Sequence, residues 1–193
     1  MERLAEFLAN YILKEEAISE EDYEIYKYGF QIGAEMFICM AVCYFLAIQM
    51  NMAGECTVFF FLFFSLRSFV GGLHMNSYKA CFLCSCMAVF LTLCAVKYCP
   101  LSPQISLFIS ICEMVFLSLL KPVENENRPV DEAEKAVFSR RIKQVLVILF
   151  FVMLFFYLIP LSSYLVTVTY TLAVIIISMF LGKWKNCKCE KPN

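Results

Sequence analysis

Charged side chains are scarce in this chain of 193 residues, at 17%, whereas hydrophobic residues make up 61%. Soluble globular domains are about half apolar and about a quarter charged. The composition therefore excludes that class and predicts an integral membrane protein of one domain. The sequence also lacks a basic amphipathic surface and any interleaving of aromatic and basic residues, so we expect no nucleic-acid partner.

Signal-peptide features are absent from the first 28 residues, which hold many acids and no basic-then-apolar pattern. Residues 1–13 instead place hydrophobic side chains at helical spacing opposite charged ones, which predicts an amphipathic helix at the membrane surface. Ser19-Glu-Glu-Asp22 matches a capping box and predicts a second helix that runs toward the first span. We interpret residues 1–29 as cytoplasmic or interfacial helices.

Long apolar segments dominate the rest of the chain. A helix needs about 20 apolar residues to cross a bilayer, and the second segment is marginal in length. We expect an all-α, polytopic membrane protein with about six transmembrane helices within residues 30–182, followed by a basic tail at 183–193. The six segments cover residues 30–50, 56–70, 80–98, 104–120, 144–160 and 162–181.

Basic residues fall almost entirely on one side of the membrane if the N-terminus is cytoplasmic and every segment crosses. Of the 16 Lys and Arg residues, 15 then lie inside and only Lys97 lies outside. This matches the positive-inside rule. The sequence therefore predicts a multi-pass protein of the plasma membrane with both termini in the cytoplasm, where thiols stay reduced.

The eleven cysteines do not indicate a disulfide framework, because most lie in apolar runs where a thiol behaves as a small hydrophobe. We expect reduced, mostly structural thiols. A zinc site built from His74, Cys81, Cys84 and Cys86 lacks the second ligand pair typical of structural zinc. We therefore predict no metal and no cofactor.

Polar chemistry concentrates in one interval between apolar segments, residues 67–85. It contains the single histidine, His74, and a cysteine seven residues later, Cys81. Such polar interruptions of membrane segments are usually functional, and we interpret this one as a Cys–His active site on the cytoplasmic side. A lone histidine that satisfies a turn beside incidental cysteines is the structural alternative.

Helix geometry places a condition on this site. On a straight helix His74 and Cys81 share a face but lie about 10 Å apart along the axis. Gly71-Gly72 can break the helix before His74 and bring the two side chains together, and the break can also supply oxyanion-hole N–H groups. Cys84 is a second candidate nucleophile, which we rank below Cys81 because we expect it to be buried more deeply in the apolar run.

Other polar residues in the apolar segments have no assigned role at this stage. Arg67 could extend to the interface or hold a substrate carboxylate. Glu113 could orient His74 or bridge two helices. The residues themselves do not choose between these alternatives.

The arrangement Arg67-x3-Gly71-Gly72-x-His74-x6-Cys81 resembles the signature of the accessory gene regulator B (AgrB) family of membrane cysteine endopeptidases. The proline-bracketed loop Lys121-Pro…Asn-Arg128-Pro before the fifth span is similar as well, with Arg128 where lysine is usual. The resemblance extends over essentially the whole chain.

That resemblance implies a catalytic pair of His74 and Cys81. The implied partner is an AgrD-like quorum-sensing propeptide, whose acidic C-terminal segment is removed through a Cys81 acyl-enzyme before ring closure to a thiolactone or lactone. It also implies a homodimer. The basic residues of the cytoplasmic loop at 121–143 are candidates for binding the acidic segment: Lys121, Arg128, Arg140 and Arg141.

Two other functions remain open on sequence grounds. The chain could be a small transporter or a membrane scaffold without catalytic activity, although a transporter usually has internal repeats and none is visible here. A different membrane acyl-transfer enzyme that uses Cys81 is the third possibility.

Overall fold

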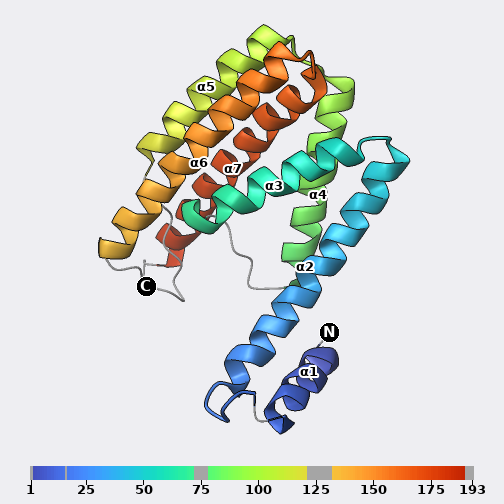
Figure 1. Ribbon diagram of the computed structural model, residues 1–193, viewed down its shortest axis with the longest axis vertical. Helices are drawn as coiled ribbons and strands as arrows, with labels where there is room; N and C mark the ends of the chain where they lie inside the picture. The colour runs from blue at the N-terminus through green and yellow to red at the C-terminus, as the bar shows by residue number, and fades with distance from the viewer. Residues whose placement is uncertain (1, 16, 72–77, 121–131, 190–193) are drawn as a thin grey trace.

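The computed structural model describes residues 2–15, 17–71, 78–120 and 132–189, and every regular element within these ranges is an α-helix (Figure 1). Helices satisfy all their internal backbone hydrogen bonds within one segment, as a bilayer requires. The prediction of an all-α, polytopic membrane protein is confirmed.

Each of the six predicted apolar segments forms a helix. Five are long and apolar enough to cross a membrane, and α5, with 17 residues, is a shorter apolar helix. The bounds are α2 Tyr23–Gln49, α3 Ala53–Val70, α4 Tyr78–Tyr98, α5 Pro103–Leu119, α6 Glu132–Leu158 and α7 Ser162–Cys189.

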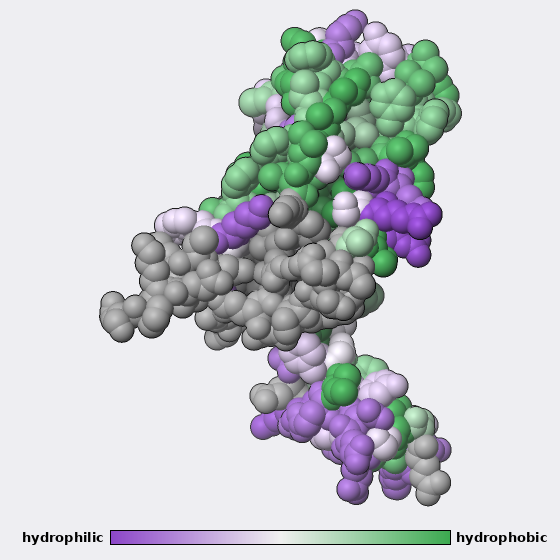
Figure 2. Space-filling view, turned by 90° about the vertical axis from the view of Figure 1, so that its left-hand side faces the viewer, coloured by the Kyte–Doolittle hydropathy of each residue, from purple (hydrophilic) through white to green (hydrophobic). Residues whose placement is uncertain are grey.

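The N-terminal region differs in part from the prediction. The amphipathic helix is present as α1, Glu2–Lys14, and its Glu6 carboxylate pairs with Lys27 of α2 at 3.1 Å. The second helix is present as α2, which continues without interruption into the first span, but it begins at Tyr23 with Asp22 as its N-cap and not with Ser19. Ser19 still accepts a hydrogen bond from the Asp22 N–H at 3.3 Å, but in the turn before the helix. Hydrophilic surface gathers at this end of the molecule, while the bundle is largely hydrophobic (Figure 2).

The last helix, α7, lies at the centre of the bundle, packed against α3, α4, α5 and α6. Its buried face is partly polar, with Thr167, Thr169 and Thr171 nearly inaccessible. Thr169 and Ser110 of α5 share a hydrogen bond of 2.8 Å between their hydroxyl oxygens. Small polar residues of this kind allow close helix approach in membranes, where apolar packing alone gives little preference between neighbours.

Two hydrophobic cores meet at α3. Leu66 of α3 packs with Met153 and Leu172 in a core shared with α5, α6 and α7. Phe59, on the same helix, packs with Leu93 of α4 in a second core shared with α2. The first half of α3 therefore packs in the core shared with α2 and α4, and its end packs in the core shared with α5, α6 and α7. The candidate site begins where α3 ends.

Candidate active site

The helix break expected at the glycine pair is present at Gly71. Helix α3 ends at Val70, and Gly71 follows with φ 72° and ψ −158°. This backbone conformation is essentially restricted to glycine, because a Cβ atom would clash with the backbone. Gly72 and His74 lie outside the described residues, so the separation between His74 and Cys81 stays a prediction.

Arg67 fastens this end of α3 to the central helix. Its Nη1 donates to the Gly71 carbonyl oxygen at 2.6 Å and to Ser178 Oγ of α7 at 2.8 Å. The guanidinium also lies 5.9 Å from the centre of the Phe63 ring, within the range of a cation–π contact. A half-buried charge needs such partners. The contacts therefore hold the C-terminal end of α3 against α7 at Ser178. Arg67 therefore does more than extend to the interface.

Cys81 lies in the first turn of α4, after the break. It is half-buried, and helical spacing places it on the face of α4 that continues through Ser85 and Ala88 to Thr92, which is 3% exposed. The thiol thus belongs to the side of α4 that faces the protein. The Arg67 guanidinium lies within electrostatic reach of the thiols of Cys81 and Cys84.

The sequence argument against Cys84 rested on deeper burial, and that part is wrong. Cys84 is exposed, on the same outer face of α4 as Leu83 and Met87. The apolar run around it is turned outward, which the sequence could not show because both lipid and core favour apolar residues. The structure gives a different distinction: Cys81 faces the bundle and Cys84 faces away from it.

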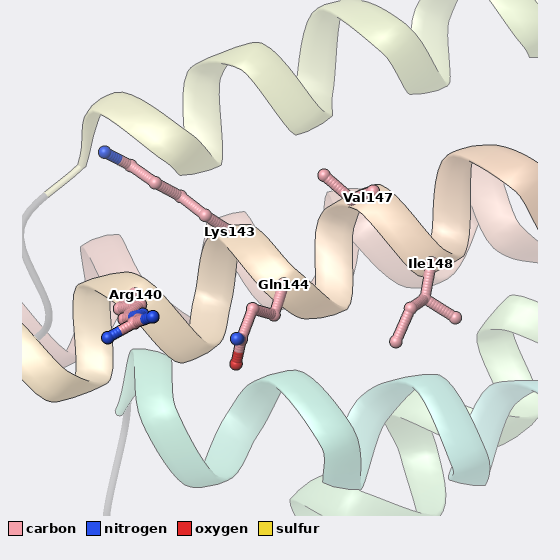
Figure 3. Close-up of a pocket in the computed structure, with 5 residues that line it drawn as sticks. All are labelled: Arg140, Lys143, Gln144, Val147 and Ile148. Atoms are coloured by element: carbon pink, nitrogen blue, oxygen red, sulfur yellow. The ribbon is translucent and has the colours of Figure 1, made fainter.

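The predicted basic residues fall into two groups. Lys121 and Arg128 lie outside the described residues, whereas Arg140 and Arg141 are exposed on α6. Arg140 borders a shallow groove of about 520 Å³, together with Lys143, Gln144, Val147 and Ile148 (Figure 3). Lys143 extends from α6 toward the end of α5, and Arg140 lies beside the end of α3. Lys143 and Gln144 were not singled out from the sequence, although helical spacing from Arg140 would have grouped them.

Glu113 is partly buried on α5, and within the described residues its Oε2 atom has no hydrogen-bond partner. Across the same part of the chain, α5 does not pack against α4, the helix that carries Cys81. Glu113 therefore lies on a different side of the bundle from the candidate nucleophile.

A cysteine cluster is present, but it is not the set considered from the sequence. Cys39 and Cys43 of α2 meet Cys86 of α4, with all three sulfur atoms within 4.8 Å of one another. Helical spacing alone pairs Cys39 with Cys43, but the approach of Cys86 depends on how α2 and α4 pack. The sequence predicts structural thiols at all three positions, and its zinc alternative combines Cys86 with His74, Cys81 and Cys84 instead.

Comparison with known proteins assigns the chain to a family. Residues 5–185 match the family described as Accessory gene regulator B. The chain belongs to the AgrB family. It is also 25% identical over 145 residues to an AgrB-like protein of Clostridium perfringens (strain SM101, type A), an alignment that covers 70% of this chain and 66% of that relative. No solved structure matches the chain.

Family membership confirms the resemblance read from residues 67–81. The matched region covers nearly the whole helical bundle, because it includes α2 to α6 in full and most of α7. The cysteine cluster between α2 and α4 lies within the matched region too.

The Gly71 conformation generates a direct test. Replacing Gly71 with alanine places a Cβ in a backbone region that strongly disfavours it, and we expect a loss of about 1–3 kcal/mol of stability. Gly33→Ala is the matched control, because Gly33 lies inside α2 with nothing within 4 Å of an added Cβ. That variant should be neutral or slightly more stable, since alanine favours helix by up to about 1 kcal/mol. Thermal unfolding in detergent micelles measures both. Equal unfolding temperatures for the two variants would contradict the assigned conformation.

Proposed function

We propose that this protein is a membrane-embedded cysteine endopeptidase that removes the acidic C-terminal segment of an AgrD-like quorum-sensing propeptide. The observation that carries the proposal is the position of Cys81 in the first turn of α4, on the side that faces the bundle and within electrostatic reach of Arg67, after α3 has ended at Gly71. Membership of the AgrB family supports the same reaction class.

In this mechanism His74 is the general base and Cys81 the nucleophile. His74 takes the thiol proton as Cys81 Sγ attacks the carbonyl carbon at the end of the pheromone segment. The tetrahedral intermediate then loses its amine, which receives the proton from His74 and leaves with the acidic segment. The acyl group remains on Cys81 as a thioester.

Ring closure completes the turnover. A cysteine or serine side chain within the same propeptide attacks the thioester carbonyl, forms a thiolactone or lactone, and returns the proton to Cys81. Thiol exchange of a thioester is nearly neutral in free energy, so ring closure competes with hydrolysis only if water is kept from the acyl-enzyme. Apolar helices around a site at the membrane face would provide that exclusion.

Helix geometry offers groups that could stabilise the oxyanion. The first four N–H groups of any α-helix lack partners within the helix, and in α4 these belong to residues 78–81. The positive end of the helix dipole lies at the same place. We propose that these N–H groups donate hydrogen bonds to the developing oxyanion, and that Gly71 and Gly72 shape the approach to it.

We further propose that the site and both termini face the cytoplasm, as the distribution of basic residues indicates. The groove on α6 then lies on the same side as the substrate. Arg140 and Lys143 would bind carboxylates of the acidic segment, while Val147 and Ile148 would contact apolar side chains next to it. A homodimer, which the family resemblance implies, belongs to the same proposal.

Co-expression with a propeptide tests the catalytic pair. Release of the acidic fragment should be lost in Cys81→Ser, which removes the thiol that forms the thioester. It should also be lost in His74→Ala, which removes the base that activates this thiol. Cys84→Ser, three residues along the same helix, is the matched control and should retain cleavage. Immunoblots of membrane fractions check that each variant accumulates. Cleavage by Cys81→Ser, or equal losses in Cys81→Ser and Cys84→Ser, would contradict the assignment.

The groove generates a second test. Arg140→Gln and Lys143→Gln should each raise KM by up to about fivefold with little change in kcat, because an exposed ion pair contributes about 0.2–1 kcal/mol. Lys14→Gln is the matched control, since Lys14 is exposed at the end of α1, away from α6. A propeptide whose tail carboxylates are replaced by amides should show no difference between the variants. The same KM increase with that amide substrate would contradict carboxylate binding.

A further inference from the structure

Three thiols converge between α2 and α4, away from the candidate catalytic pair. Cys39 and Cys43 lie one helical turn apart on α2, and Cys86 approaches them from α4. The Sγ atoms of Cys39 and Cys86 are 3.8 Å apart. Among the residues the structure describes, no other three metal-ligating side chains gather this closely.

The cluster is enclosed by apolar packing. Cys43 is 1% exposed and belongs to the core that α2, α3 and α4 share, while Cys39 and Cys86 are half-buried against that core. Burial of Cys43 leaves little room for a water ligand.

The sulfur separation distinguishes two kinds of thiol chemistry. A disulfide requires about 2.05 Å between sulfurs. Two thiolates bound to one metal at about 2.3 Å are separated by about 3.8–4.0 Å at tetrahedral or trigonal angles. The Cys39–Cys86 distance of 3.8 Å, where the two thiols share a hydrogen bond, fits the second case. The Cys43 sulfur lies within 4.8 Å of both.

The donor set selects the ion. Three sulfur donors from cysteine favour soft cations over magnesium, calcium or manganese, which prefer oxygen. Zinc in structural sites takes four ligands, and this cluster supplies three. Monovalent copper accepts soft thiolate ligands and needs no fourth.

We propose that Cys39, Cys43 and Cys86 form a binding site for one soft cation, Cu(I), between α2 and α4. Each cysteine that ligates as a thiolate releases its proton to the aqueous phase. No electron transfer is involved, because the cation binds and leaves in the same oxidation state.

The site has a mechanical consequence for α4. Cys86 follows Cys81 by five residues, about 7.5 Å along the helix axis. A bound cation would connect α4 to α2 five residues after Cys81. It would therefore restrict movement of the first turn of α4, which carries Cys81. This consequence for cleavage rests on the proposed peptidase function, whereas cation binding does not.

Competition for Cu(I) tests the site directly. The full chain, reduced and purified anaerobically in detergent micelles, is titrated with Cu(I) against a chromogenic Cu(I) chelator. We expect one Cu(I) per chain in the wild-type protein. Cys39→Ser, Cys43→Ser and Cys86→Ser should each weaken binding by at least about tenfold, since even loss of a group that only supports a metal ligand costs about 10–100-fold. Size-exclusion chromatography checks folding, and the half-buried Cys39 and Cys86 variants carry the test if Cys43→Ser does not fold.

Two sets of controls isolate the cluster. Cys94→Ser on α4 and Cys112→Ser on α5 remove thiols outside it and should bind as the wild type does. Cys81→Ser should also bind Cu(I) normally, so a failure of the peptidase proposal leaves this test intact. Equal weakening in Cys94→Ser, or wild-type affinity in Cys39→Ser and Cys86→Ser, would overturn the site. Displacement of Cu(I) by an equal concentration of Cd(II) would overturn the choice of cation.

Discussion

The rest of the site depends on how the Arg67 charge is accommodated. A guanidinium within an apolar bundle is costly unless its N–H groups are paired, and Arg67 pairs with the Gly71 carbonyl and with Ser178 of the central helix. The first bond fixes where the chain leaves α3, and the second fixes that point against α7. These two contacts thus position Gly71, where the backbone leaves α3, against the central helix.

The two hydrophobic cores give this anchor its rigidity. Helix α3 contributes Phe59 to one core and Leu66 to the other, so it cannot shift without disturbing both. Helix α4 belongs to the core with α2, and the side of α4 that faces the protein runs from Cys81 toward Thr92. Cys81, the proposed nucleophile, lies in the first turn of α4, and α3 ends at Gly71, whose backbone conformation is essentially restricted to glycine.

Sequence analysis predicted the helices well and their faces poorly, for a physical reason. Helix α1 was predicted from the helical spacing of its apolar residues, although it is Ala5 and Ala9 that are buried while Leu4 and Phe7 are exposed. Gly71-Gly72 marked the break because glycine tolerates positive φ. In the spans, lipid and protein core both favour apolar residues, so periodicity does not tell inward from outward positions. For this reason the exposure of Cys84 was mispredicted, and the pairing of Arg67 with Ser178 and the approach of Cys86 to Cys39 were missed. The position of His74 stays a prediction.

Trapping the acyl-enzyme tests the central claim most directly. The purified protein is mixed with a propeptide whose ring-closing cysteine is replaced by alanine, quenched in acid, digested and analysed by mass spectrometry. The account predicts a thioester between the pheromone segment and Cys81, which hydroxylamine removes. An adduct on Cys84, or release of the acidic fragment without any hydroxylamine-sensitive adduct on Cys81, would contradict it.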